Sequence, residues 1–211
     1  MFQDRKDAGQ QLARRLERFL STNPLVLALP RGGVVVGAEV AHILGCALDV
    51  LLVKKLRAPD NPELAVGAVC EEGRSFLNDE VVRVTGADKA YLKREIEERI
   101  AEMAEQRELY RAVKPRIAAT GQTTILVDDG LATGATMIAA AQVVAGANPK
   151  RLIVAVPVGP PDTVSQLEAM DEIDDVICLY APEWFGGVGQ FYGDFSQVSD
   201  VEVAALLEEF A

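Results

Sequence analysis

The stretch Thr124–Val144 reads TILVDDGLATGATMIAAAQVV and combines a strand, an acidic pair, a turn and a helix. Its first four residues form an apolar run that is typical of a buried strand. Asp128 and Asp129 follow the strand, and small side chains then lead into an apolar helix. In an open α/β sheet, ligands bind beyond the carboxyl ends of the strands. The stretch therefore predicts a strand–turn–helix unit with a binding site at its turn.

The turn GLATGAT, residues 130–136, indicates an anion site. Backbone N–H groups and the positive end of a helix bind oxyanions, and Thr133 and Thr136 add hydroxyl donors. A ligand with a phosphate bound in the turn and vicinal hydroxyls bound to the two carboxylates would be a sugar phosphate. The alternatives are that either threonine only caps the helix, that the acids are solvated, or that they belong to an unrelated metal site.

Strands and helices alternate on both sides of this stretch. Apolar patterns predict strands at 24–29, 48–56, 151–158 and 174–180, and helices at 5–20, 34–45, 88–111 and from about 160. A loop is predicted at 58–63, and a hairpin at 64–78 that turns at Glu72–Gly73. This order predicts an α/β fold with a doubly wound, mainly parallel sheet. We expect one domain over 1–211 with a core at about 5–180, an irregular segment at about 181–198 and a C-terminal helix at 199–210.

Composition narrows the classes of function. The formal net charge of −11 argues against a nucleic-acid partner held by bulk electrostatics. The charged N-terminus and the lack of a long apolar run predict neither a membrane span nor a secretory signal. Three widely spaced cysteines indicate reduced thiols in a cytoplasmic protein. The chain has a single histidine, His42, which excludes multi-histidine metal sites. His42 lies in an apolar helical pattern, which favours a half-buried helix residue.

The segment ILVDDGLATGATM, residues 125–137, resembles the ribose-phosphate signature of type I phosphoribosyltransferases. Members of that family use it to hold 5-phosphoribosyl-1-pyrophosphate (PRPP) with Mg²⁺. The resemblance implies that Asp128 and Asp129 engage the ribose hydroxyls and lie near the metal. It also implies a cradle for the 5-phosphate, which would consist of Ala132, Thr133, Gly134, Ala135 and Thr136.

Two further stretches are similar to family features. Arg31-Gly32-Gly33 follows the first core strand and looks like the pyrophosphate loop, in which a non-proline cis peptide is usual. Glycines there admit backbone amides to a pyrophosphate, and arginine supplies a bidentate donor. Lys54 and Lys55 fit the basic pair that family members often carry after the third strand. Arg57 fits the further cation with which a flexible lid begins in these proteins. The alternatives are a plain strand–helix turn and a solvated basic strand end.

The acceptor side of the resemblance is less complete. Enzymes for 6-oxopurines carry an acid directly before the Thr-Gly pair, where this chain has Ala132. Proton transfer must then come from elsewhere, and Glu63 in the lid is the candidate. The irregular segment at 181–198 corresponds to the acceptor hood, with candidate stacking residues and a candidate metal ligand in Asp194. The stacking candidates are Trp184, Phe185, Phe191 and Tyr192, for which packing in the core is the alternative.

The resemblance implies an Mg²⁺-dependent phosphoribosyltransferase. It would move the phosphoribosyl group of PRPP to a nitrogenous base or amine and release pyrophosphate, with the cations stabilising the leaving group. The alternatives are a non-catalytic PRPP-binding regulator on the same fold and, more remotely, a phosphosugar enzyme on another fold. The expected partners are small molecules, with no nucleic acid and no membrane. The sequence is compatible with a homo-oligomer and does not identify the acceptor.

Overall fold

The structure is a computed structural model that describes residues 1–62 and 64–211. Glu63, the candidate for acceptor proton transfer, lies outside the described residues. Within the described part of the chain, no helix is both long and apolar enough to span a bilayer.

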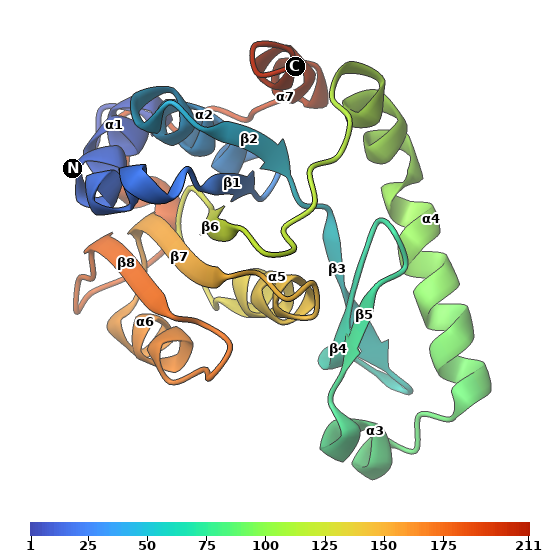
Figure 1. The fold of residues 1–211 in the computed structure, drawn as a ribbon. Helices are drawn as coiled ribbons and strands as arrows, with labels where there is room; N and C mark the ends of the chain where they lie inside the picture. Colours follow the sequence, from blue (N-terminus) through green and yellow to red (C-terminus); the bar gives the residue numbers. More distant parts are fainter.

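A five-stranded parallel sheet forms the centre of the molecule (Figure 1). Its strand order is β2-β1-β6-β7-β8, and every pairing between neighbours is parallel. The strands are β1 (Leu25–Ala28), β2 (Ala47–Val50), β6 (Thr123–Val127), β7 (Arg151–Val158) and β8 (Asp175–Tyr180). All residues of β1 and β6 are buried because helices cover both faces of the sheet.

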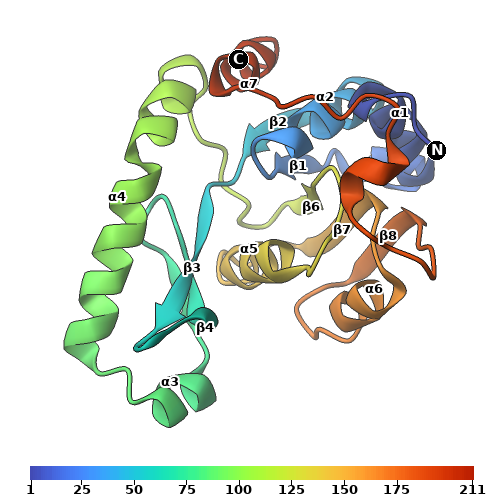
Figure 2. The same cartoon turned by 180° about the vertical axis from the view of Figure 1, so that it is seen from behind.

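Helices lie on both faces, which confirms the predicted doubly wound fold. They are α1 (Arg5–Leu16), α2 (Gly32–Leu44), α5 (Ala135–Ala145) and α6 (Pro161–Glu168), and the short helix η1 (Glu17–Thr22) continues α1. The side chains of β1 alternate between two apolar clusters: Val26 packs with α1 and α2, and Leu27 packs with α5 and α6. Figures 1 and 2 show α1 and α2 on one side of the sheet and α5 and α6 on the other.

The strand predicted at 48–56 is wrong as a single element, because the chain leaves the central sheet in its middle. β2 ends at Val50, and β3 (Val53–Ala58) belongs to a separate antiparallel sheet with β4 (Asn61–Cys70) and β5 (Ser75–Leu77). Between them, the Leu51 N–H donates to the Ala28 carbonyl and the Leu52 carbonyl accepts from Glu71 N–H. Both leucines are buried, so the apolar run continues through the break and hides it.

The predicted lid loop is shorter than expected. Ala58 pairs with Asn61 in an antiparallel register, which leaves Pro59 and Asp60 as the turn of a hairpin. Asp60 adopts a positive φ of 60°, as turn residues do. The second hairpin turns at Gly73 with φ 81°, which confirms the predicted position.

The remaining elements flank the second sheet and close the chain. They are α3 (Asp79–Thr85), α4 (Lys89–Val113), η2 (Val188–Phe191) and α7 (Asp200–Glu208). The long predicted helix is confirmed as α4, which begins after its cap residue Asp88. It runs beside the second sheet and reaches α7 near the C-terminus (Figures 1 and 2). The short helix α3 was not predicted from the sequence.

A buried ionic cluster joins α4 to both sheets. Arg111 of α4 donates from Nη1 to Asp49 of β2 at 2.6 Å and from Nε to Glu71 at 3.1 Å. Asp49 also accepts from the Ile117 N–H at 2.8 Å. Because both carboxylates are buried, the guanidinium fixes the second sheet against the edge of the first.

Candidate functional site at the sheet switch point

The site lies where the direction of the strand order reverses. From β1 the chain continues through α2 to β2, while from β6 it continues through α5 to β7 on the other side. Ala28 and Val127 pair at the carboxyl ends of β1 and β6, and the Leu29 N–H donates to the Val127 carbonyl at 2.9 Å. The crevice beyond two such strands is the usual ligand site of an open α/β sheet.

The segments after β1 and β6 touch each other. A Cβ on Gly32 would lie 1.9 Å from Oδ2 of Asp129, and one on Gly33 would lie 2.9 Å from the Cα of Asp128. Only glycine fits at Gly32 without displacing the carboxylate. The Pro30–Arg31 peptide bond directly before them is cis, a feature that the family resemblance implied. The structure therefore brings the predicted loop and the acid pair together.

The two carboxylates form a compact pair. The Asp129 N–H donates to Oδ1 of Asp128 at 2.8 Å, and the Tyr192 hydroxyl donates to the Asp129 carbonyl at 2.5 Å. Burial and the neighbouring charge of Asp129 raise the pKa of Asp128 above its ordinary value. A divalent cation would relieve this repulsion, and Mg²⁺ typically takes one or two protein carboxylates together with substrate phosphates. The donor set therefore fits the implied metal.

Among the described residues, no third histidine, cysteine or acid joins the pair as a metal ligand. The prediction for Asp194 is therefore corrected. Its Oδ1 accepts from the N–H of Ser196 at 2.9 Å and also from the Ser196 hydroxyl. Asp194 is exposed and is held in this local turn.

The turn after the acid pair, which the sequence predicts to be an anion site, leads directly into α5. Gly134 precedes α5 with φ 69°, and a Cβ there would lie 2.4 Å from Cγ2 of Thr163. Among the described side chains none caps α5; Thr133 makes only a 3.5 Å contact with the Ala135 N–H. This weighs against the capping alternative. A cavity of about 160 Å³ is lined by Asp128, Val188 and residues 130–137, which include Ala132.

A second cavity of about 430 Å³ adjoins the first through Thr136, which lines both. Arg31 and Lys54 line it, together with Met103 and Gln106 of α4. Two cations, a hydroxyl and the start of α5 thus surround a space next to the first cavity. Such a set of donors suits a second anionic group.

Lys55 and Arg57 do not line this cavity, so the structure places two of the four predicted cations, Arg31 and Lys54, around it. Successive strand residues point to opposite faces, which separates Lys55 from Lys54. Lys54, Lys55 and Arg57 are all exposed. At Arg57 the register of β3 shifts, and Glu95 accepts from its backbone N–H at 3.0 Å.

The four candidate stacking residues of the hood lie in different environments. Trp184 is 89% exposed, and Phe185 stacks on Phe191 with ring centroids 5.4 Å apart. Tyr192 is buried against Phe2 and Phe195, so we correct it from an acceptor contact to a packing residue. None of the four lines either cavity; the hood residue that does is Val188.

Two charged residues that contact the site were not predicted from the sequence. Arg5 donates from Nε to Oδ2 of Asp129 at 2.7 Å. Asp200 pairs with Arg31 at 3.5 Å, and its Oδ1 accepts from Gln106 at 2.9 Å and from the Tyr110 hydroxyl. Both lie far from the motifs in sequence, and neither has a local pattern that could have marked it.

This geometry defines a class of protein: an α/β domain with its ligand crevice at a switch point between β1 and β6. The model of the phosphoribosyl transferase domain matches residues 4–196. The chain therefore belongs to the phosphoribosyl transferase family.

Relatives agree with this assignment. The crystal structure of TT1426 from Thermus thermophilus has 46% identity and a TM-score of 0.93, covering 100% of this chain and 99% of that one. Two Mycobacterium tuberculosis proteins, MT0597 (strain CDC 1551 / Oshkosh) and Rv0571c (strain ATCC 25618 / H37Rv), are provisionally named phosphoribosyl transferases. Each is 45% identical over 208 residues, which is 99% of this chain but 46% of the relative. The chain thus spans about half the length of these curated relatives.

Proposed function

We propose that the chain transfers the 5-phosphoribosyl group of PRPP to a nitrogenous base or amine, with Mg²⁺ and with release of pyrophosphate. The observation that carries this proposal is the pair of adjoining cavities that share Thr136, with Asp128 of the acid pair lining one and Arg31 and Lys54 lining the other. Two adjoining sites of this kind suit a molecule with a 5-phosphate and a pyrophosphate on one sugar. Family membership supports the same reaction class.

The chain's own residues would act mainly by positioning and electrostatics. Backbone N–H groups at residues 133–136 would hold the 5-phosphate, and Asp128 and Asp129 would accept from the ribose hydroxyls. Arg31 and Lys54 would stabilise the leaving pyrophosphate as negative charge accumulates on it. Mg²⁺ bound near the acid pair and the phosphates would add further charge stabilisation.

A non-catalytic PRPP-binding protein is the second candidate. One observation favours it: Lys55 and Arg57 stay outside the cavity, so fewer cations face the leaving group than the family resemblance implied. For either candidate we expect small-molecule partners. The three cysteines are unpaired, which supports the expected cytoplasmic setting.

The first test uses the acid pair. Asp128→Asn and Asp129→Asn should each weaken binding of Mg·PRPP by about tenfold or more while the fold is kept, because hydrogen bonds to charged groups are lost. Calorimetric titration measures the affinity, and circular dichroism checks the fold. Wild-type affinity in a folded double variant would remove these acids from the site.

The second measurement separates the two candidates. Pyrophosphate release from Mg·PRPP is followed with adenine, uracil, hypoxanthine, guanine and ammonia as acceptors. Release that depends on an acceptor supports the transferase. Tight PRPP binding without release of pyrophosphate in the presence of any acceptor supports the regulator.

A further inference from the structure

Arg5 lies outside every motif of the proposed site, yet it forms an ion pair with Asp129 of the acid pair. Its Nε donates to Oδ2 of Asp129 at 2.7 Å, and the two side chains are only 11% and 16% exposed. A shielded ion pair of this kind is stronger than one on the surface. Arg5 therefore bears on how Asp129 meets a ligand.

Contacts with the hood fix the guanidinium of Arg5. Nη1 donates to the Ser196 carbonyl at 2.7 Å, and the guanidinium carbon lies 3.9 Å from the centre of the Phe195 ring. At the start of α1, the Asp7 N–H donates to the Asp4 carboxylate at 2.8 Å, which sets the direction of the helix that carries Arg5. The side chain is thus preorganised rather than free to swing.

The segment before Arg5 is itself bound to the hood. The Phe2 N–H donates to the Phe191 carbonyl, the Gly193 N–H to the Phe2 carbonyl, and the Asp194 N–H to the Gln3 carbonyl, each at 2.8 Å. Together with the bond from the Tyr192 hydroxyl to the Asp129 carbonyl, these contacts tie the position of the hood to Asp129.

These contacts occupy one side of the acid pair. Oδ2 of Asp129 accepts from Arg5, and Oδ1 of Asp128 accepts from the Asp129 N–H. No other donor among the described residues bonds to the second oxygen of either carboxylate, and the two carboxylates contact each other. We propose that Arg5 is a positioning residue that holds Asp129 so that these two oxygens accept from vicinal hydroxyls of the phosphosugar. This role rests on the proposed function.

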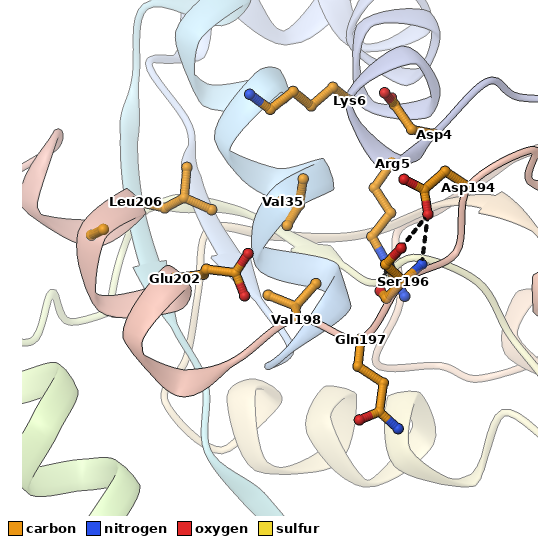
Figure 3. A pocket seen from close by; sticks show the side chains of 11 residues that line it. Asp4, Arg5, Lys6, Val35, Asp194, Ser196, Gln197, Val198, Glu202 and Leu206 are labelled. Atoms are coloured by element: carbon orange, nitrogen blue, oxygen red, sulfur yellow. Dashed lines mark hydrogen bonds between the residues drawn. The ribbon is translucent and has the colours of Figure 1, made fainter.

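A cavity beside Arg5 gives access for a test. It has about 350 Å³ and is lined by Arg5, Lys6, Val35, Ser196 and Val198, among others. Figure 3 shows Arg5 next to Asp194 and Ser196 at one end of the cavity, while the Lys6 side chain points away from them. Truncation of Arg5 would connect this cavity with the space beside Asp129, so a small cation from solvent could replace the guanidinium.

The experiment measures Mg·PRPP affinity by calorimetry and slow PRPP hydrolysis as turnover. Arg5→Ala should weaken PRPP binding by about tenfold or more, with saturated turnover changed less than about threefold, because Arg5 orients a binding group. Methylguanidinium at millimolar concentration should restore much of the affinity. Lys6→Ala, which removes the neighbouring cation from the same cavity, should bind PRPP within about twofold of wild type.

Equal or tighter PRPP binding by folded Arg5→Ala would overturn the proposal, since it would mean that Arg5 only blocks Asp129. So would restoration by tetramethylammonium as effective as that by methylguanidinium. If Arg5→Ala does not fold, Arg5→Lys gives the answer: one amine cannot serve Asp129 and Ser196 in the same geometry, so wild-type affinity would also overturn it. If the wild type binds no PRPP, the proposed function fails; if it binds and the variants match it, only the role of Arg5 fails.

Discussion

Ala132 stands directly before Thr133 and Gly134, and its exposed side chain is at the cradle-lining turn. Its carbonyl accepts from the Thr163 hydroxyl at 3.3 Å, which fixes the backbone of the turn against α6. A methyl group at this position can neither take up nor release a proton. Whatever acceptor binds next to the turn therefore receives no acid–base help from residue 132.

This leads to a prediction about the acceptor. Hypoxanthine and guanine should be poor substrates, because general acid–base catalysis typically contributes about 10²–10⁴-fold in rate. Adenine, uracil or an amine should give a higher kcat/KM in steady-state assays with Mg·PRPP. If a 6-oxopurine exceeded the others by tenfold or more, another residue would have to exchange the proton.

At the scale of elements, β3 is placed so that one of its lysines faces the cavity. The Arg111 cluster fixes the second sheet against β2, and β3 then passes along α4, whose Met103 and Gln106 also line the cavity. Alternation along the strand sends Lys54 toward this space and Lys55 away from it. The two neighbouring lysines thus form a matched pair for experiment.

Lys54→Ala should weaken binding of inorganic pyrophosphate and slow turnover by about tenfold, because a cation that faces the developing charge is lost. Lys55→Ala removes the same charge one residue away and should change both by less than about twofold. Calorimetry with pyrophosphate and the hydrolysis assay provide the two readouts. Equal effects of both substitutions would show that only the overall charge of β3 matters.

At the scale of the whole molecule, Asp200 connects the last helix to the site and to α4. It pairs with Arg31 and accepts from Gln106 and Tyr110. Burial alone would raise the pKa of Asp200, but the hydrogen bonds from Tyr110 and Gln106 and the charge of Arg31 outweigh it and lower the pKa below 3.8. The docking of α7 therefore depends on an ionised Asp200.

Because the folded pKa of Asp200 is lowered, its stabilising effect is complete above the ordinary value of 3.8 and is lost as the pH falls through the folded pKa. Wild type should melt at a higher temperature than Asp200→Asn above about pH 5, and the gap should shrink in more acidic buffer. Thermal melts by circular dichroism measure the gap. The exposed Asp171→Asn serves as control, and a gap that widens on acidification would contradict the prediction.

The sequence by itself determined the local elements around the motif. Apolar periodicity and turn residues placed β1, β6, β7, β8 and their helices, and the spacing of Asp128, Asp129 and Gly134 indicated the anion turn. These features depend on neighbours within about one helical turn or one strand, so a linear pattern carries them. Gly32 and Gly33 were also identified, although only the structure shows that Asp129 and Asp128 are the groups they admit.

Only the tertiary structure decided which distant residues meet. The break between β2 and β3 arises because Leu51 and Leu52 are buried on the way from one sheet to the other, and burial looks the same in both. The side on which Lys54, Lys55, Tyr192 and Asp194 face likewise follows from packing against other elements. The contacts of Arg5 with Asp129 and of Asp200 with Arg31 join residues separated by 124 and 169 positions. Such pairs are formed by chain crossings and surface charges, which leave no periodic signal in the sequence.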